Sequence, residues 1–103
     1  MVARDTGQVW IAVYMMASRK HGVIYIGVTS QLLERVAQHR EGRLAGFTKR
    51  YGVDRLVWFE THESISTAIQ RERTMKKYKR DWKTNLIERA NPNWADLYPG
   101  LAN

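Results

Sequence analysis

The 103-residue chain contains no cysteine, which excludes disulfides, thiolate nucleophiles and cysteine-ligated zinc sites. Long apolar runs are also missing. The longest, residues 9–17, is about half the length that a membrane-spanning helix needs. Residues 1–8 are polar and lack the apolar core of a secretory signal peptide. We therefore expect a cytoplasmic protein that does not enter a membrane.

Linkers and repeats are lacking as well. No internal repeat, low-complexity stretch or segment rich in Pro, Gly and Ser divides the chain. Its length suits one hydrophobic core, and hydrophobic residues make up 44% of the sequence, enough to fill one. We expect a single domain over residues 1–103, with its core at about 9–96.

Acidic residues are few relative to basic ones. Ten Asp and Glu stand against 17 Lys and Arg, which gives a net charge of +7 and a pI near 10.1. On so small a domain this excess favours polyanionic partners, nucleic acid first and an anionic membrane surface second. A basic protein with no charged partner is the alternative.

Two apolar segments near the N-terminus predict a β-hairpin. Residues 9–16 are apolar at every position and rich in β-branched and aromatic types, as expected of a central strand buried on both faces. Turn residues occupy 18–22, and residues 23–27 predict a second short strand. Residues 56–59 predict a third strand.

Helical periodicity marks three later segments. The first runs from residue 32 to about 41, with Thr29 or Ser30 as its cap, and the second begins at Ser64. The third covers residues 82–90, and residues 42–52 are expected to form a loop. The predicted fold class is α/β (α+β): a three-stranded antiparallel sheet flanked by helices, in the order strand, strand, helix, strand, helix, helix.

One carboxylate falls on the apolar stripe of the second predicted helix. Ile65, Ala68, Ile69 and Met75 recur at about 3.6 residues per turn, and Glu72 follows the same stripe. A carboxylate that faces a core is costly unless it is paired or binds a metal. Glu72 is therefore a candidate metal ligand, with an ion pair or a partly exposed edge position as the alternative.

Four further polar residues are candidates for a site. Arg35 and His39 are four residues apart and share one helix face. There an arginine can stabilise charge on a phosphoryl group, and a histidine can bind phosphate or orient a neighbour. Tyr14 and Tyr25 lie on the two strands of the hairpin, so their hydroxyls matter only if they converge. A solvated helix flank and ordinary strand packing are the alternatives.

Basic residues are concentrated in two places. The predicted loop carries Lys49 and Arg50, and residues 71–83 interleave Tyr78 and Trp82 with many cations. Cations bind phosphate oxygens and aromatic rings stack on unpaired bases, so both segments are candidate nucleic-acid surfaces. A solvated helix face is the alternative for the second, whose cations are Arg71, Arg73, Lys76, Lys77, Lys79, Arg80 and Lys83.

Taken in order, the candidates resemble the signature of the GIY-YIG nucleases. The tyrosines are eleven residues apart and the arginine follows ten residues after the second, which is similar to the family spacing. The resemblance spans about residues 9–96, and residues 47–52 look like a segment typical of small standalone bacterial members. The residues that carry it are Tyr14, Tyr25-Ile26-Gly27, Arg35, His39 and Glu72.

Two departures from the family pattern are visible. The first triad is Ala12-Val13-Tyr14 rather than Gly-Ile-Tyr, which should matter little on a strand. The chain also carries no separate DNA-binding domain of the kind that family members with known targets usually have. The second departure bears on specificity rather than on chemistry.

The resemblance implies a role for each candidate. Glu72 would hold one divalent cation, Mg²⁺ or Mn²⁺, and Arg35 would bind the scissile phosphate. Tyr14 would act as general base or orient the attacking water, aided by Tyr25, and His39 would support the phosphate or Tyr14. A tyrosine can act as a base only if its pKa falls from about 10, which the metal or Lys49 would bring about.

The leading hypothesis is thus a metal-dependent endonuclease that hydrolyses phosphodiester bonds, with DNA as the expected target and DNA repair or recombination as the setting. A non-catalytic nucleic-acid-binding module of the same fold is the first alternative. A protein- or lipid-binding domain with Trp58, Trp82 and Trp94 as exposed anchors is the second. Asn91 and Asn93 are assigned to turns, outside the site. The residues expected to dock nucleic acid are Lys49, Arg50, Lys76, Lys77, Lys79 and Arg80.

Overall fold

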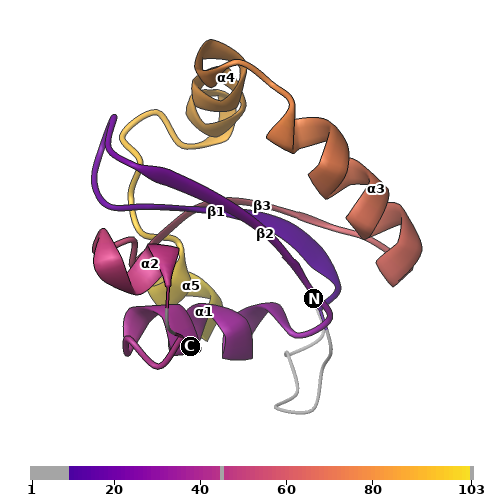
Figure 1. Cartoon of the computed structure of the whole chain (residues 1–103), viewed down its shortest axis with the longest axis horizontal. Helices are drawn as coiled ribbons and strands as arrows, with labels where there is room; N and C mark the ends of the chain where they lie inside the picture. The colour runs from indigo at the N-terminus through magenta and orange to yellow at the C-terminus, as the bar shows by residue number, and fades with distance from the viewer. Residues whose placement is uncertain (1–9, 45, 103) are drawn as a thin grey trace.

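The computed structural model describes residues 10–44 and 46–102. It confirms the predicted three-stranded antiparallel sheet flanked by helices. One short helix lies within the predicted loop and another follows the last predicted helix. The elements are β1 (Ala12–Ala17), β2 (Ile24–Thr29), α1 (Leu32–Arg40), α2 (Phe47–Arg50), β3 (Arg55–Thr61), α3 (Ile65–Lys76), α4 (Arg80–Ala90) and α5 (Tyr98–Ala102) (Figure 1).

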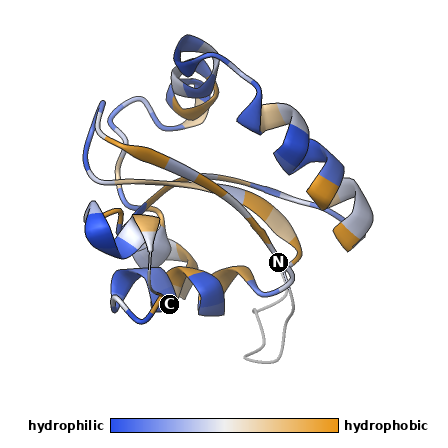
Figure 2. Ribbon diagram, in the orientation of Figure 1, coloured by the Kyte–Doolittle hydropathy of each residue, from blue (hydrophilic) through white to orange (hydrophobic). Residues whose placement is uncertain are grey.

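Strand β1 is the centre of the sheet, as its sequence predicts. The strand order is β2-β1-β3, and all six residues of β1 are buried. The first residue of the predicted strand, Val9, lies outside the described residues. Helices α3 and α4 cover one face of the sheet, and α1, α2 and α5 cover the other (Figure 1). Orange, which marks apolar residues, is frequent along the strands, whereas the helices of both layers carry blue as well as orange (Figure 2).

The alternation of β1 side chains assigns Tyr14 to one of these layers. Successive residues of a strand point to opposite faces. Val13 and Met15 pack in the cluster that includes Ala68 and Met75 of α3. Tyr14 packs instead in the second cluster, with residues of α1. The first tyrosine therefore faces α1.

The two helix caps predicted from sequence have different outcomes. Ser64 caps α3, as predicted: its hydroxyl accepts a hydrogen bond from the Thr67 backbone N–H at 3.3 Å. The cap predicted for α1 is wrong, because Gln31 occupies that position. The Thr29 hydroxyl accepts from the Gln31 backbone N–H at 3.0 Å, a local turn contact two residues on.

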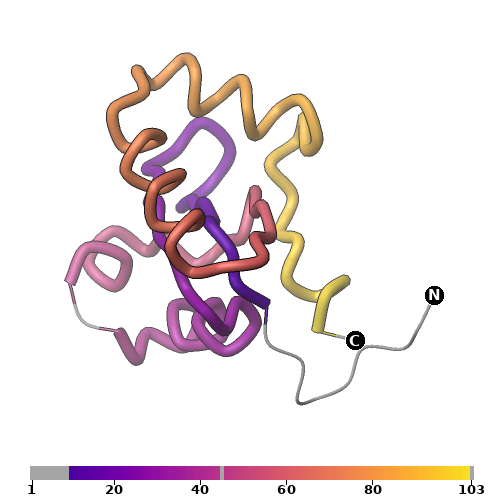
Figure 3. The backbone as a smooth tube through the Cα atoms, turned by 90° about the vertical axis from the view of Figure 1, so that its right-hand side faces the viewer, coloured from indigo at the N-terminus to yellow at the C-terminus, as the bar shows by residue number. Residues whose placement is uncertain are grey.

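The chain after α4 runs back past β3 to α5 (Figure 3). Asn91 fixes this segment: its side-chain amide donates to the carbonyl oxygens of Val57 on β3, at 3.0 Å, and of Ala95, at 2.9 Å. Its side-chain oxygen accepts from the Ala95 N–H at 3.0 Å. Asn91 is thus a structural residue, which agrees with its assignment to a turn.

The tryptophans correct the hypothesis of three exposed anchors. Trp94 has no exposed surface, and its indole N–H donates to Glu88 at 2.8 Å. Trp58 is also buried, and both belong to the core cluster under α3 and α4. Of the three, only Trp82 is exposed, at 60%. The other two pack in the hydrophobic core, because a domain this small needs large apolar side chains to fill its interior.

Candidate active site

The pairing of β1 with β2 explains the glycine of the Tyr25-Ile26-Gly27 triad. Tyr14 lies opposite Gly27 in the register. A Cβ atom at Gly27 would lie 2.5 Å from both Cζ and the hydroxyl oxygen of Tyr14. The phenol ring therefore rests directly over the glycine backbone, and any side chain there would displace it.

The same alternation brings the two tyrosines together. Tyr25 is two residues before Gly27 and points to the same face of the sheet. The ring centroids of Tyr14 and Tyr25 are 6.2 Å apart. The two tyrosine side chains therefore lie close together in the fold, as the candidate site requires.

Helix α1 adds Arg35 and His39 to this pair. Nε2 of His39 lies 2.9 Å from the Tyr14 hydroxyl oxygen, in a buried contact. The His39 ring is also 5.3 Å from the Tyr25 ring, centroid to centroid. Arg35 is one helical turn before His39 and interacts electrostatically with both Tyr14 and His39. Four of the five predicted catalytic residues therefore form one cluster.

A fifth member of the cluster, Thr48, was not identified from the sequence. It is buried on α2, and its hydroxyl oxygen lies 3.0 Å from Nδ1 of His39. A neutral imidazole has one donor and one acceptor nitrogen, so His39 links the hydroxyls of Tyr14 and Thr48 with both satisfied. The only signal in the sequence was the position of Thr48 within residues 47–52, where we expected a loop.

Burial determines the protonation of this cluster. Removal from water, and then the positive charge of Arg35, lower the pKa of His39 to about 4. Burial, followed by the charge of Tyr25, raises the pKa of Tyr14 above its ordinary value, although the Arg35 guanidinium opposes the shift. At neutral pH His39 is thus uncharged and Tyr14 keeps its proton.

Only part of the cluster is open to solvent. Tyr14 has no exposed surface and His39 is 6% exposed. Tyr25 and Arg35 are half-buried. A phosphate or water arriving from outside therefore meets Tyr25 and Arg35 first, with Tyr14 and His39 behind them.

Glu72 lies in the opposite layer, on α3. Its carboxylate forms an ion pair with Lys76, with 2.9 Å between Oε2 and Nζ, and its side chain is 14% exposed. Successive helix residues point about 100° apart. Because Arg71 reaches Glu60 of β3, Glu72 occupies the flank of α3 away from that strand, toward the edge strand β2. Among the described residues, Glu72 makes no hydrogen bond or ion pair with the cluster.

The donor set limits how a metal could be held. Within the described ranges, no group of three or more His, Cys, Asp or Glu side chains is placed to hold a metal ion. Magnesium does not require one, because it commonly binds through one or two carboxylates together with substrate phosphates and water. A partly exposed Glu72 fits a cation shared with the nucleic acid, and does not fit one held by protein alone.

The candidate nucleic-acid residues fall into two groups. Lys49 and Arg50 are exposed on α2, beside the cluster. Lys77 and Lys79 are exposed between α3 and α4, on the other layer. The structure therefore places the two basic segments on opposite sides of the sheet.

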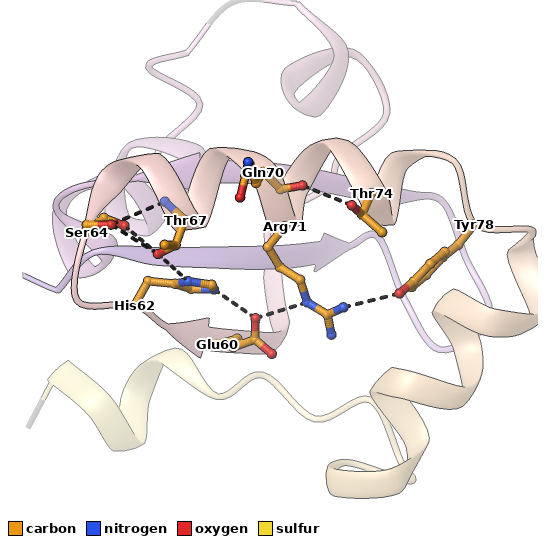
Figure 4. Close-up of polar contacts among 8 residues, drawn as sticks. All are labelled: Glu60, His62, Ser64, Thr67, Gln70, Arg71, Thr74 and Tyr78. Atoms are coloured by element: carbon orange, nitrogen blue, oxygen red, sulfur yellow. Dashed lines mark hydrogen bonds and ion pairs between the residues drawn. The ribbon is translucent and has the colours of Figure 1, made fainter.

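Two arginines of the 71–83 segment have structural partners. Arg80 donates to the backbone carbonyls of His21, at 3.0 Å, and Gly22, at 2.6 Å, and so holds the turn between β1 and β2. Arg71 donates to Glu60 at 3.1 Å and to the Tyr78 hydroxyl at 3.2 Å (Figure 4). These contacts occupy part of the positive charge that would otherwise meet phosphate.

Comparison with known proteins identifies the family of this chain. The sequence model of the GIY-YIG catalytic domain matches residues 11–85, which include all five predicted catalytic residues. The chain belongs to the GIY-YIG family. This family comprises nucleases, which act on nucleic acids. No helix among residues 10–44 and 46–102 has the length and apolar character needed to cross a membrane.

Several relatives of this GIY-YIG chain are known by sequence. A UPF0213 protein of Haloquadratum walsbyi is 35% identical over 65 residues, which are 63% of this chain and 73% of that protein. UPF0213 proteins of Staphylococcus epidermidis and Staphylococcus aureus are 34% and 36% identical over 67 residues, covering 65% of this chain and 82% of each relative. No solved structure matches significantly.

Proposed function

We propose that this GIY-YIG chain is a metal-dependent endonuclease that hydrolyses phosphodiester bonds in nucleic acid, with DNA as the expected target. The observation that carries the proposal is the convergence of Tyr14, Tyr25, Arg35 and His39 on one face of the β1–β2 pair. Packing alone does not account for a guanidinium close to a buried phenol and an uncharged imidazole, whereas the binding of a phosphate at Arg35 does account for it.

Arg35 and Tyr25 are the groups that would touch the substrate. Both are half-buried, so they are fixed by packing yet reachable from solvent. The guanidinium binds the scissile phosphate and stabilises the negative charge that develops on it. The Tyr25 oxygen accepts a hydrogen bond from the attacking water and orients it toward phosphorus.

Tyr14 and His39 would act behind them as positioning residues. Because the pKa of Tyr14 is raised, its hydroxyl remains a hydrogen-bond donor at neutral pH. Neutral His39 connects that hydroxyl to Thr48 and keeps its orientation. Tyr14 has no exposed surface and so cannot touch the substrate directly. Tyr25, rather than Tyr14, is therefore the residue that would orient the attacking water.

Glu72 is the residue that would hold the cation, Mg²⁺ or Mn²⁺. Its carboxylate supplies a hard oxygen ligand, and the exposed Lys76 side chain can move away from it at little cost. Because α3 and the cluster lie on opposite faces of the sheet, the cation would neutralise charge on the leaving oxygen only where the substrate backbone passes around the β2 edge. Lys49 and Arg50 on the cluster side, and Lys77 and Lys79 on the other layer, would hold the flanking backbone.

The proposal is tested by incubating the purified chain with branched, single-stranded and duplex DNA, in Mg²⁺ or in EDTA. Arg35→Ala, Tyr25→Phe and Glu72→Gln are run in parallel with an Asn93→Ala control at an exposed position. We expect cleavage that needs Mg²⁺ and falls at least about 100-fold in the three site variants. Cleavage that persists in EDTA would remove the mechanism, and binding without any cleavage would favour the non-catalytic module.

A further inference from the structure

A row of aromatic rings leads from the candidate active site to the surface. The ring of Tyr25 lies 6.2 Å from that of Phe47, and the ring of Phe47 lies 4.9 Å from that of Tyr51. Phe47 and Tyr51 are four residues apart on the turn of α2 and so share one side of it. Apolar ring surface thus continues outward from a residue proposed to meet the scissile phosphate.

The outer rings are unusually accessible for their type. Phe47 is 45% exposed and Tyr51 is 48% exposed, whereas Tyr14, at the inner end of the row, has no exposed surface. Together with Lys49, Arg50 and Gly46, the two rings line a hollow of about 760 Å³. Exposing two adjacent large rings is unfavourable in water unless a partner covers them.

The charges of this hollow identify the chemistry of that partner. Among the described residues that line it, the two that carry a charge, Lys49 and Arg50, are both cationic. The Arg50 guanidinium carbon lies 5.5 Å from the centre of the Tyr51 ring. Flat apolar surface bordered only by positive charge is complementary to an aromatic base joined to a phosphate.

We propose that Phe47 and Tyr51, bordered by Lys49 and Arg50, form a base-stacking ledge (Phe47, Lys49, Arg50 and Tyr51) for an unpaired nucleotide next to the scissile phosphate. The ledge rests on the proposed function and specifies its substrate class. Bases within a duplex are paired and stacked, so their faces are not available to protein rings unless they are extruded, which costs a few kcal/mol. The preferred substrates are therefore single strands, flaps and branches with unpaired bases beside the cut.

The test measures binding in EDTA, so that no cleavage is required, by fluorescence anisotropy of labelled oligonucleotides. The probes are a single strand, the same strand with abasic sites in place of its bases, and a blunt duplex. We expect the full chain to prefer the intact single strand. Phe47→Ala/Tyr51→Ala should lose about 5- to 100-fold in affinity for that strand and little for the abasic strand or the duplex.

Two controls separate stacking from general damage. Phe47→Trp/Tyr51→Phe keeps the rings and should retain binding, whereas Ile65→Ala removes an equally exposed apolar side chain from α3 and should change nothing. Equal losses on intact and abasic strands would overturn the ledge. So would sedimentation that shows a dimer for the original chain and a monomer for Phe47→Ala/Tyr51→Ala, because the rings would then bind a second copy.

The outcome also separates this inference from the proposed function. If the chain cuts in Mg²⁺ and the double variant binds the single strand as well as the original, only the ledge fails. If the ring-dependent preference appears without any cleavage in Mg²⁺, the ledge stands and the nuclease proposal fails. If the chain binds none of the probes, both fail.

Discussion

The Nε2 atom of His39 lies 2.9 Å from the hydroxyl oxygen of Tyr14, at a point where neither side chain has appreciable contact with solvent. Burial, and then the positive charge of Arg35, keep the imidazole uncharged in this contact. A group that must stay neutral to fold makes stability depend on pH.

The free energy of unfolding should therefore decrease in mild acid. Folding lowers the pKa of His39 from 6.5 to about 4, so between these values the unfolded state binds more protons than the folded state. The contribution of neutral His39 to the free energy of unfolding is at its full value above about pH 6.5. It decreases as the pH falls from 6.5 to about 4 and stays constant at lower pH. The loss amounts to about 3 kcal/mol.

Urea denaturation at a series of pH values checks this expectation. His39→Gln should flatten the curve between pH 4 and 6.5, whereas Ile65→Ala, at an exposed residue with no titratable side chain, should leave it unchanged. If the free energy of unfolding decreases equally between pH 6.5 and 4 in the original chain and in His39→Gln, His39 is not the group responsible.

Gly27→Ala should damage both activity and stability. The added methyl would lie 2.5 Å from the Tyr14 hydroxyl, so the ring must move and release His39. We expect a loss of about 1–3 kcal/mol in unfolding free energy and about a 100-fold loss in cleavage, since small displacements at an active site are costly.

Gly100→Ala is the matched control, because a Cβ there meets nothing within 4 Å. Thermal unfolding and initial cleavage rates distinguish the two variants. Full activity in Gly27→Ala would mean that the exact position of Tyr14 is unimportant, which would weaken the positioning role assigned to it.

Most of the fold could be predicted because local patterns and tertiary packing agree in it. Uninterrupted apolar residues identified β1 as the central strand, and Ser64 at the start of a periodic segment identified the cap of α3. The pattern could not reveal α2, since a four-residue helix is too short to display periodicity. Thr48 was missed with it.

The candidate site was predictable in part for a related reason. Helix spacing is local, so Arg35 and His39 could be related to each other from their separation, whereas their meeting with Tyr14 and Tyr25 was implied only by the family resemblance. Glu72 depends on how α3 crosses the sheet, which spacing does not determine. The burial of Tyr14 likewise results from long-range packing, and it changes which tyrosine can meet a water molecule.

Glu72→Gln should abolish metal binding with almost no effect on stability. The substitution keeps the shape of the side chain and removes one ligand charge. Its ion pair with the exposed Lys76 contributes only about 0.5 kcal/mol. Isothermal titration calorimetry with Mn²⁺, in the presence of a phosphorothioate strand that resists cleavage, measures the loss of metal affinity directly.

Lys76→Ala separates the two roles of the Glu72 carboxylate. It breaks the same ion pair and leaves the carboxylate free, so metal affinity should be unchanged or slightly higher. If Lys76→Ala and Glu72→Gln reduce metal affinity equally, the Glu72 carboxylate only stabilises α3 through its ion pair, and the cation binds elsewhere.

Asn91→Ala should destabilise the chain while preserving its chemistry. The substitution leaves the Val57 carbonyl and both backbone groups of Ala95 without their partner, at a cost of about 2–4 kcal/mol. Exposed Asn93, in the same turn, should tolerate alanine within about 0.5 kcal/mol. Thermal melts rank the variants. A large activity loss in Asn91→Ala under conditions where it is fully folded would contradict its assignment outside the site.

Affinity for nucleic acid should fall steeply with salt, since phosphate contacts release counterions in proportion to their number. Removing two contacting cations should reduce the slope of log affinity against log salt concentration by about two. We expect this reduction for Lys49→Ala/Arg50→Ala and, separately, for Lys77→Ala/Lys79→Ala, because both pairs are exposed. Lys20→Ala, at an exposed lysine in the β1–β2 turn, is the control. A slope that changes in only one pair would assign the docked strand to that layer of the fold, and a slope near zero in the original chain would rule out both.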